Sequence, residues 1–336
     1  MKKTIVCAWL GLLLCALLTL LPVSAPGEPA VTPSPAAAEA AVYEAPDTLR
    51  VLLPDGEIET MALEDYVRGV LAAEMPADFP IEALKAQAVA ARTYALYCAA
   101  GHKHGGADVC TRFSCCQAWR DEQALREQWG TDYERCADRL RRAAAETEGQ
   151  ILTWEGEPVF AAFHSSSAGA TEDCGAVWNP RPYLVSVPSP ETAETVPGFL
   201  SGLRCSALDF RDTILSACPE ADLSGPAESW LGELRRDGSG RAASVVIGGQ
   251  ELRGTELRSL FSLRSTAFTL EYEDGDFVFT VAGFGHGVGM SQYGARIMAE
   301  EGADYAAILA HYYPGTALTA LRPEGRESAE RALICG

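Results

Sequence analysis

Positively charged residues are scarce in this sequence, and they do not cluster. The 336 residues include 27 Lys and Arg against 46 Asp and Glu, which gives a formal net charge of −19 at pH 7. A chain with this excess of negative charge repels polyanions, so we exclude nucleic acid and anionic lipid head groups as binding partners. The densest basic group, Arg139, Arg141 and Arg142, is typical of a solvated helix face.

The sequence also lacks the marks of two common kinds of site. The glycines of GHGVG at residues 285–289 are not followed by the Lys-Ser/Thr pair of a phosphate-binding loop. Serines 165–167 adjoin His164, but neighbours in sequence seldom form a nucleophile and base, and no nucleophile elbow surrounds them. We therefore expect neither a nucleotide site nor a serine hydrolase.

Cysteine is plentiful, but it cannot pair completely. Of 11 cysteines, Cys7 and Cys15 lie in an apolar leader, and an odd number follows. The densest group of thiol and imidazole side chains lies between residues 102 and 116, where His104, Cys110 and Cys116 recur at a spacing of six. Such a set suits tetrahedral zinc in a structural role, because a site closed by Cys and His has no open position. The expected ligands are His104, Cys110, Cys115 and Cys116.

Two features keep the zinc prediction open. His102 lies next to the cluster, and the spacing differs from the paired knuckles of common zinc folds. The alternative is a disulfide from Cys110 to Cys116, or to the distant Cys98 or Cys136, which an exported protein would favour.

Residues 1–25 are typical of a membrane-targeting segment. Lys2 and Lys3 precede an apolar run from Ile5 to Val23, longer than the roughly 7–15 residues of a signal-peptide core. We expect one N-terminal anchor in the cell membrane with the remaining chain outside, or a secreted protein if the leader is cleaved. Residues 26–47, rich in Pro and Ala, are expected to form a linker.

One acidic residue continues an apolar helical stripe. The large side chains of segment 63–71 follow the i, i+3, i+4, i+7, i+8 spacing of an amphipathic helix, and Glu74 falls on the same face. Pro76 ends the helix there, which places Glu74 beside the unpaired carbonyls of the last turn. Burial and this dipole both disfavour the ionised form, so we expect a raised pKa, as a general acid needs. The alternative is a Glu at the edge of the stripe that bonds a backbone group or an Arg.

The remaining pattern predicts an α+β fold, with mixed helices and antiparallel strands around a substrate cleft. Residues 48–320 form the main domain, in which 188–240 is an inserted lobe or part of the same unit, and 321–336 is a C-terminal tail. Helices are expected at 63–74, from Pro80 through Ala95, at 124–147 and at 295–301 with Ser291 as N-cap. Strands are expected at 48–53, 58–61, 151–153, 159–163, 244–247, 267–272 and 277–281.

Four segments resemble those of one family. LEDYVRGVLAAEMPADFPIEALKAQAVAARTYAL (63–96) and GHGVGMSQYGARIMAEEGADYAAILAHYYPGT (285–316) are similar to the opening and closing signatures of stage II sporulation protein D. HSSSAGATEDCGAVWNP (164–180) and the stretch 244–271 also match in style, so the resemblance covers most of the chain after residue 48.

The resemblance implies a lytic transglycosylase that acts on peptidoglycan glycan strands without stem peptides, with Glu74 as catalytic acid and base. It also implies work with a sporulation amidase and membrane anchoring proteins during engulfment. Some family members hold zinc at a comparable His and Cys cluster. The chain offers no convincing second carboxylate, which suits a reaction in which the muramic acid's own 6-hydroxyl attacks.

Polar residues in these segments are the expected substrate-binding groups, since amide, phenol and imidazole groups suit sugar hydroxyls and acetamido groups. Gln87 and Arg92 are expected to reach toward Glu74 across the helix corner. The full expected set is Gln87, Arg92, His164, Ser165, His286, Gln292 and Tyr293.

Two other functions are compatible with the sequence. Related domains are named amidase enhancers, so the chain can be a non-catalytic wall-binding protein that stimulates an N-acetylmuramoyl-L-alanine amidase. A zinc-dependent hydrolase acting through the His104 cluster is the second alternative.

Overall fold

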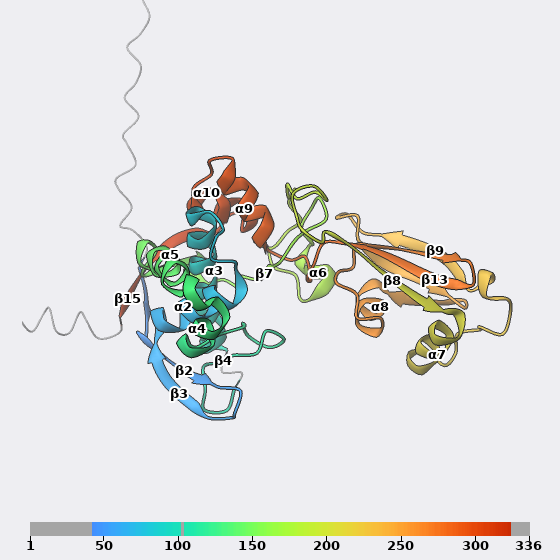
Figure 1. Cartoon of the computed structure of the whole chain (residues 1–336), viewed down its shortest axis with the longest axis horizontal. Helices are drawn as coiled ribbons and strands as arrows, with labels where there is room; N and C mark the ends of the chain where they lie inside the picture. The colour runs from blue at the N-terminus through green and yellow to red at the C-terminus, as the bar shows by residue number, and fades with distance from the viewer. Residues whose placement is uncertain (1–41, 102–103, 324–336) are drawn as a thin grey trace, which may run out of the picture. The chain divides into compact units, whose positions relative to one another are not determined.

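Two hydrophobic cores organise the described part of the chain, residues 42–101 and 104–323, in this computed structural model (Figure 1). The first core joins residues from both ends of this part, from Ala45 to Leu184 and from Val288 to Tyr313. The second core uses residues between Phe210 and Val281. We call the two groups of elements the first and second regions. The predicted leader and residues 26–41 of the predicted linker lie outside the described residues, as does most of the tail. The end of the predicted linker is not a free spacer, because Val42–Ala45 form a strand that pairs with the strand at 317–323.

The first region is mostly helical and contains two sheets, ordered β1-β15-β5-β6 and β3-β2-β4. Strands β7 and β14 form a short parallel pair beside them. Its elements are β1 (Val42–Ala45), β2 (Thr48–Leu52), β3 (Ile58–Ala62), α2 (Leu63–Glu74), α3 (Ile81–Ala100), β4 (Val109–Cys110), α4 (Glu122–Trp129), the 3-10 turn η1 (Gly130–Asp132), α5 (Tyr133–Glu146), β5 (Gln150–Trp154), β6 (Glu157–Pro158), β7 (Phe163–His164), α6 (Cys174–Val177), β14 (Met290–Ser291), α9 (Gln292–Glu300), α10 (Tyr305–Tyr312) and β15 (Ala317–Pro323).

Helix α3 is the centre of the first region because its sequence is apolar on nearly every side. Small residues such as Ala86, Ala90 and Ala91 are fully buried, which lets neighbouring helices approach closely. Helices α2, α5, α9 and α10 and strand β5 all contact it, and Figure 1 shows α3 among these helices. Helix α2 therefore buries its apolar stripe against α3 and ends at Glu74, where Met75 turns extended before Pro76.

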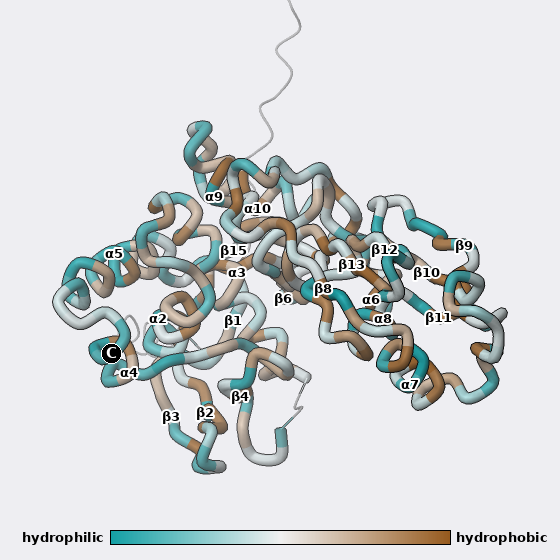
Figure 2. Tube along the Cα trace, turned by 45° about the vertical axis from the view of Figure 1, so that its right-hand side comes forward, coloured by the Kyte–Doolittle hydropathy of each residue, from teal (hydrophilic) through white to brown (hydrophobic). Residues whose placement is uncertain are grey.

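The second region is mostly β-structure, with two antiparallel three-stranded sheets ordered β11-β10-β9 and β12-β13-β8. Its core is aromatic: the rings of Phe210 and Phe277 stack at 3.8 Å. Hydrophobic and hydrophilic residues follow one another along α7 (Figure 2). Phe210 is buried, whereas Leu208 is 63% exposed. Its elements are β8 (Leu200–Ser206), α7 (Ala207–Ala217), η2 (Ala227–Ser229), β9 (Leu231–Arg236), β10 (Ala242–Ile247), β11 (Gln250–Arg253), α8 (Gly254–Leu260), β12 (Phe268–Glu273) and β13 (Asp276–Ala282).

The predicted mixed α+β class is confirmed, and most strands pair antiparallel. In the hairpin of β12 and β13, Leu270 pairs with Phe279 and the turn lies at the predicted Asp274-Gly275. The predicted lobe at 188–240 overlaps the second region, whose core continues to Val281. None of the helices in the described part of the chain is long and apolar enough to cross a membrane.

Two predicted elements are wrong. The single helix expected at 124–147 is divided into α4 and α5, because Gly130 adopts φ 50° and ends α4. The strand expected at 159–163 is absent between β6 and β7. Its backbone instead folds back locally, with Ala161 N–H bonded to Val159 O at 2.8 Å, and so does not offer a continuous strand edge.

Candidate functional site: a carboxyl group beside a thiol-rich loop

Glu74 is the last residue of α2, and its side chain is half-buried. Its Oε1 accepts a hydrogen bond of 2.8 Å from the backbone N–H of Ala118. Burial raises the pKa of Glu74 above its usual 4.5, while the bond from Ala118 opposes the shift by stabilising the ionised form. The sequence predicted either a buried acid with a raised pKa or a Glu bonded to a backbone group. Glu74 has both features, since its carboxyl group is desolvated and accepts a backbone hydrogen bond.

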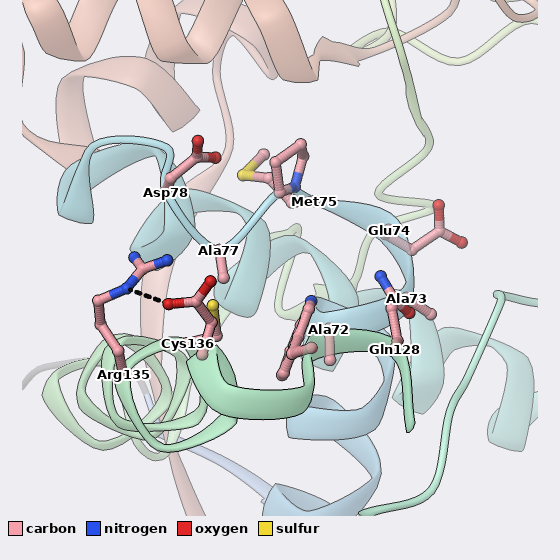
Figure 3. A pocket seen from close by; sticks show the side chains of 12 residues that line it. Ala72, Ala73, Glu74, Met75, Ala77, Asp78, Gln128, Arg135 and Cys136 are labelled. Carbon is pink, nitrogen blue, oxygen red and sulfur yellow. Dashed lines mark hydrogen bonds and ion pairs between the residues drawn. The ribbon is translucent and has the colours of Figure 1, made fainter. Parts of the chain in front are cut away.

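A pocket of about 500 Å³ lies between the end of α2 and the α4–α5 segment, and Glu74 is on its wall. Asp78, Arg135 and Cys136 also line it. Figure 3 shows Glu74 extending away from Arg135 and Cys136, so that the carboxyl group lies at one margin of the pocket. Arg135 is paired with Asp132 at 3.4 Å, and both side chains are exposed.

The four predicted metal ligands come together in one cluster. Their donor atoms all lie within 4.8 Å of one another, and His104 Nε2 is 3.2 Å from Cys116 Sγ and 3.8 Å from Cys115 Sγ. Tetrahedral zinc with sulfur ligands needs donor separations of roughly 3.8 Å, so these residues fit the ion. Cys110 ends β4, and a turn through Arg112 brings Cys115 and Cys116 back to it.

The disulfide alternative is not supported. Across residues 42–101 and 104–323, no cysteine forms a disulfide, and this covers Cys98, Cys110, Cys116 and Cys136. His102, the other imidazole near the cluster, lies outside the described residues. Burial and the neighbouring thiols raise the pKa of Cys110 to about 11.

The loop after Cys116 connects the ligand cluster to Glu74. Ala118, which donates to Glu74, follows Cys116 by two positions, and Arg120 N–H donates to Gly69 O of α2 at 3.2 Å. Trp119 lies so close to Gly69 that a Cβ there would be 2.1 Å from the indole Nε1. The loop is therefore docked on the helix that carries Glu74.

Segment 164–180, which we call the central block, begins with the buried side chain of His164. Its Nδ1 lies 3.2 Å from Val288 O, which can only accept, so Nδ1 donates and Nε2 accepts from Ser167 Oγ at 2.7 Å. Burial, with the nearby charge of Arg241, holds the pKa of His164 well below 6.5, so the ring is neutral. Ser167 therefore hydrogen-bonds His164, but both side chains are buried, so His164 does not line an open cleft as the sequence predicted.

The polar residues of segment 285–316, which we call the closing block, contact different parts of the first region. Gln292 is buried, and its Nε2 donates to Gln87 Oε1 of α3 at 3.4 Å. The ring of Tyr293 packs edge to face on Phe79 at 5.1 Å, in the corner that follows Glu74. Tyr293 N–H donates to Ser165 O at 3.0 Å, which ties the central block to α9. Ser291 caps α9, as predicted, by accepting from Gly294 N–H.

His286 is half-exposed. Its imidazole lies 5.7 Å from that of His164 and 4.7 Å from the indole of Trp178. Burial and the charges of Arg258 and Arg241 lower the pKa of His286 to about 4, so the ring is neutral at physiological pH.

The prediction that Arg92 reaches toward Glu74 is wrong. It is fully buried, and its Nη2 and Nε bond the carboxylate of Glu64 at 2.6 and 2.7 Å, while Nη1 bonds Gln150 O at 3.0 Å. Glu64 lies in the first turn of α2, at the opposite end from Glu74. The pair therefore anchors α2 to α3 and β5, and Arg92 is occupied there.

Sequence reasoning missed three groups. The Ala118 N–H is a backbone donor, which no side-chain pattern can reveal. Glu191 is buried, and its Oε1 accepts from Ser167 N–H at 2.9 Å and from the hydroxyl of Ser291. Arg241 is 1% exposed and lies 3.8 Å from Glu172. The sequence signal for Arg241 is its position directly before the apolar strand β10.

Together these features define the class of site. A desolvated carboxyl group lies at the end of a helix and accepts a hydrogen bond from the loop that follows a Cys and His cluster. Comparison with known proteins identifies the family of the chain. The family profile described as "SpoIID: Stage II sporulation protein" matches residues 55–154. The chain belongs to the stage II sporulation protein D family, a family of sporulation proteins.

The relatives cover most of the chain. Stage II sporulation protein D of Bacillus amyloliquefaciens is 37% identical over 287 residues, 83% of this chain and 80% of the relative. The protein of the same name from Bacillus subtilis is 37% identical over 270 residues, 78% and 76% of the two chains. The amidase enhancer of Bacillus subtilis is 29% identical over 304 residues, 75% of this chain but 40% of the enhancer.

Proposed function

We propose that this protein is a lytic transglycosylase that cleaves peptidoglycan glycan strands lacking stem peptides and leaves 1,6-anhydro-N-acetylmuramic acid ends. The observation that carries the proposal is the raised pKa of Glu74, a half-buried carboxyl group at the wall of a surface pocket. A general acid must hold its proton near neutral pH until the leaving oxygen accepts it.

A single acid is sufficient for this reaction. Glu74 gives its proton to the glycosidic oxygen as the bond from that oxygen to C1 breaks. The 6-hydroxyl of the same muramic acid then attacks C1 and returns its proton to Glu74, so water is not consumed. The Ala118 N–H supports the second half of the cycle because it stabilises the ionised carboxylate.

The Cys and His cluster supports the site structurally in this proposal. When bound, zinc would link His104, Cys110, Cys115 and Cys116 and supply no open coordination position. The closed ligand set disfavours the zinc hydrolase alternative. The cluster instead fixes the turn from which Ala118 reaches Glu74.

The remaining parts of the proposal come from the family. They are action during engulfment, a partner amidase that removes stem peptides, anchoring membrane proteins, and an N-terminal anchor that leaves the catalytic domain outside the cell membrane. The net charge of −19 agrees with a partner that is not nucleic acid.

The second candidate is a non-catalytic enhancer of an N-acetylmuramoyl-L-alanine amidase. The similarity to the amidase enhancer of Bacillus subtilis favours it. An enhancer binds the wall or the amidase and needs no proton relay, so it does not depend on the acidity of Glu74.

Mass spectrometry of purified denuded glycan strands, incubated with the full-length protein, tests the two candidates. Anhydro-muramic ends are the expected product. Reducing ends would mean hydrolysis by water. Intact strands together with a stimulated amidase would establish the enhancer and overturn the transglycosylase.

A further inference from the structure

Trp178 is a large aromatic side chain left partly open to solvent. It follows the short helix α6, and its N–H bonds Cys174 O at 2.7 Å, so the backbone that carries it is fixed. The residue is 42% exposed. An exposed indole has an apolar face whose burial by a ligand is favourable, and Trp is among the commonest anchors of binding sites.

Two aromatic neighbours hold the indole in place. Phe160 meets it edge to face at 5.3 Å, and the imidazole of His286 lies 4.7 Å away at an angle of 59°. The guanidinium of Arg181 lies 5.2 Å above the Phe160 ring. The indole is therefore supported by its neighbours while part of its surface stays accessible.

A backbone hydrogen bond and close packing fix the loop that carries His286. Glu172 N–H donates to Gly287 O at 2.8 Å. A Cβ on Gly287 would lie 2.6 Å from the Arg241 guanidinium carbon, so this buried cation is directly against the loop. These contacts fix the backbone of the loop, so the surface that His286 forms with Trp178 is preorganised.

Contacts connect this surface with the region of Glu74. Phe160 also contacts Tyr94 of α3 at 5.3 Å. Tyr94 in turn lies beside the Cys98 and Cys116 thiols. The loop that bonds Glu74 begins at Cys116, so the two surfaces flank the same cluster.

We propose that Trp178, backed by Phe160 and His286, is a stacking platform for an N-acetylhexosamine ring of a glycan strand. The apolar C–H face of such a ring matches an exposed indole, and the neutral imidazole beside it adds no charge to repel or attract the sugar. The platform deepens the proposed function and rests on it for the class of substrate.

Calorimetric titration of chitohexaose into the full-length protein tests the platform. The parent is the Glu74→Gln protein, in which binding is measured without turnover. Adding Trp178→Ala is expected to raise the Kd about tenfold, and Trp178→Phe to raise it less, because a smaller ring keeps part of the stacking surface. Leu208→Ala, which removes another exposed apolar side chain, is the control and should leave the Kd unchanged.

The outcomes separate the platform from the catalytic proposal. An unchanged Kd in the Trp178→Ala protein, with its thermal midpoint preserved, overturns the platform, and so does a parent that does not bind chitohexaose. If Trp178→Ala weakens binding while Glu74→Gln leaves strand cleavage intact, the platform holds and the role of Glu74 fails. If Glu74→Gln abolishes cleavage while Trp178→Ala leaves the Kd unchanged, the role of Glu74 holds and the platform fails.

Discussion

The two regions of this protein satisfy their buried groups differently. The second region is a stack of aromatic rings under antiparallel strands. Its buried cation, Arg241, lies 3.8 Å from Glu172 of the first region. The first region buries an ion pair, a thiol cluster and several polar atoms without a partner, among them Gln87 Nε2, Trp119 Nε1 and Glu191 Oε2. Buried polar groups without partners cost stability and cluster at functional sites. We therefore expect the chemistry to lie in the first region and the second region to support it.

Glu74→Gln should have the largest effect, because it removes the proton that the leaving oxygen needs. We expect formation of anhydro-muramic ends to fall about 10²- to 10⁴-fold. Timed product analysis by mass spectrometry measures it. Asp78→Asn is the matched control, since Asp78 is an exposed carboxylate of the same pocket. An equal loss in the Asp78 variant would mean that desolvation of Glu74 is irrelevant.

Loss of the metal ligands should be the next largest effect. Cys116→Ser is expected to abolish zinc binding and lower the unfolding free energy by about 4 kcal/mol, the value for a ligand at about a thousand times its Kd. Elemental analysis and denaturant unfolding measure the two changes. Cys205→Ser, in the second region, should change neither, and zinc retained by the Cys116 variant would contradict the cluster as the metal site.

Phe210→Ala tests the supporting role of the second region. Its ring is fully buried against Phe277, so truncation should cost about 3–5 kcal/mol of unfolding free energy. Below the unfolding transition, the rate of strand cleavage should stay unchanged. The exposed Leu208 provides the control, and Leu208→Ala should cost less than about 0.5 kcal/mol. A large fall in cleavage by folded Phe210→Ala protein would show that the second region does more than support.

Gly69→Ala sharpens the link between the cluster loop and Glu74. The added methyl group would overlap the Trp119 indole, at a cost of about 1–3 kcal/mol, and displace the loop. Without the Ala118 N–H, the ionised carboxylate loses a donor, so the pKa of Glu74 should rise further. Carbon-detected NMR titration of the Glu74 carboxyl group measures this. Gly101→Ala, where a Cβ has only ordinary contacts, should leave that pKa alone.

The smallest effect is on stability as a function of pH. Because the pKa of Glu74 is raised in the folded state, its contribution to stability is complete below the unfolded pKa and is lost as pH rises through the folded value. Glu74→Gln should therefore flatten the fall in unfolding free energy above pH 4.5 and leave the protein at least as stable at pH 7. A Gln variant with the same pH profile as the parent would argue that Glu74 is freely solvated.

Local patterns predicted the elements that bury one clear face. The stripe from Leu63 to Leu71 and the stop at Pro76 gave α2 with its end at Glu74, and Asp274-Gly275 gave the hairpin turn. The pattern failed where a glycine took a left-handed conformation inside a helical sequence, as at Gly130, and where an apolar run had no strand to pair with, as after Val159. Periodicity reports which face is apolar, but it does not report what is available to cover that face.

The ligand cluster was predictable because its residues are close in sequence. The partners of Arg92 and His164 were not, because Glu64 and Val288 come from segments that only packing brings together. The same holds for the Ala118 N–H, a donor that every non-proline residue possesses.

The sequence by itself determined the family, the acid at the end of a helix, and the thiol and imidazole groups of one short loop, since each depends on residues adjacent along the chain. Only the tertiary structure decided that the loop bonds Glu74, that Arg92 is committed to Glu64, and that Trp178 stands against His286. These outcomes depend on distances between segments far apart in sequence, which are fixed when the whole core closes.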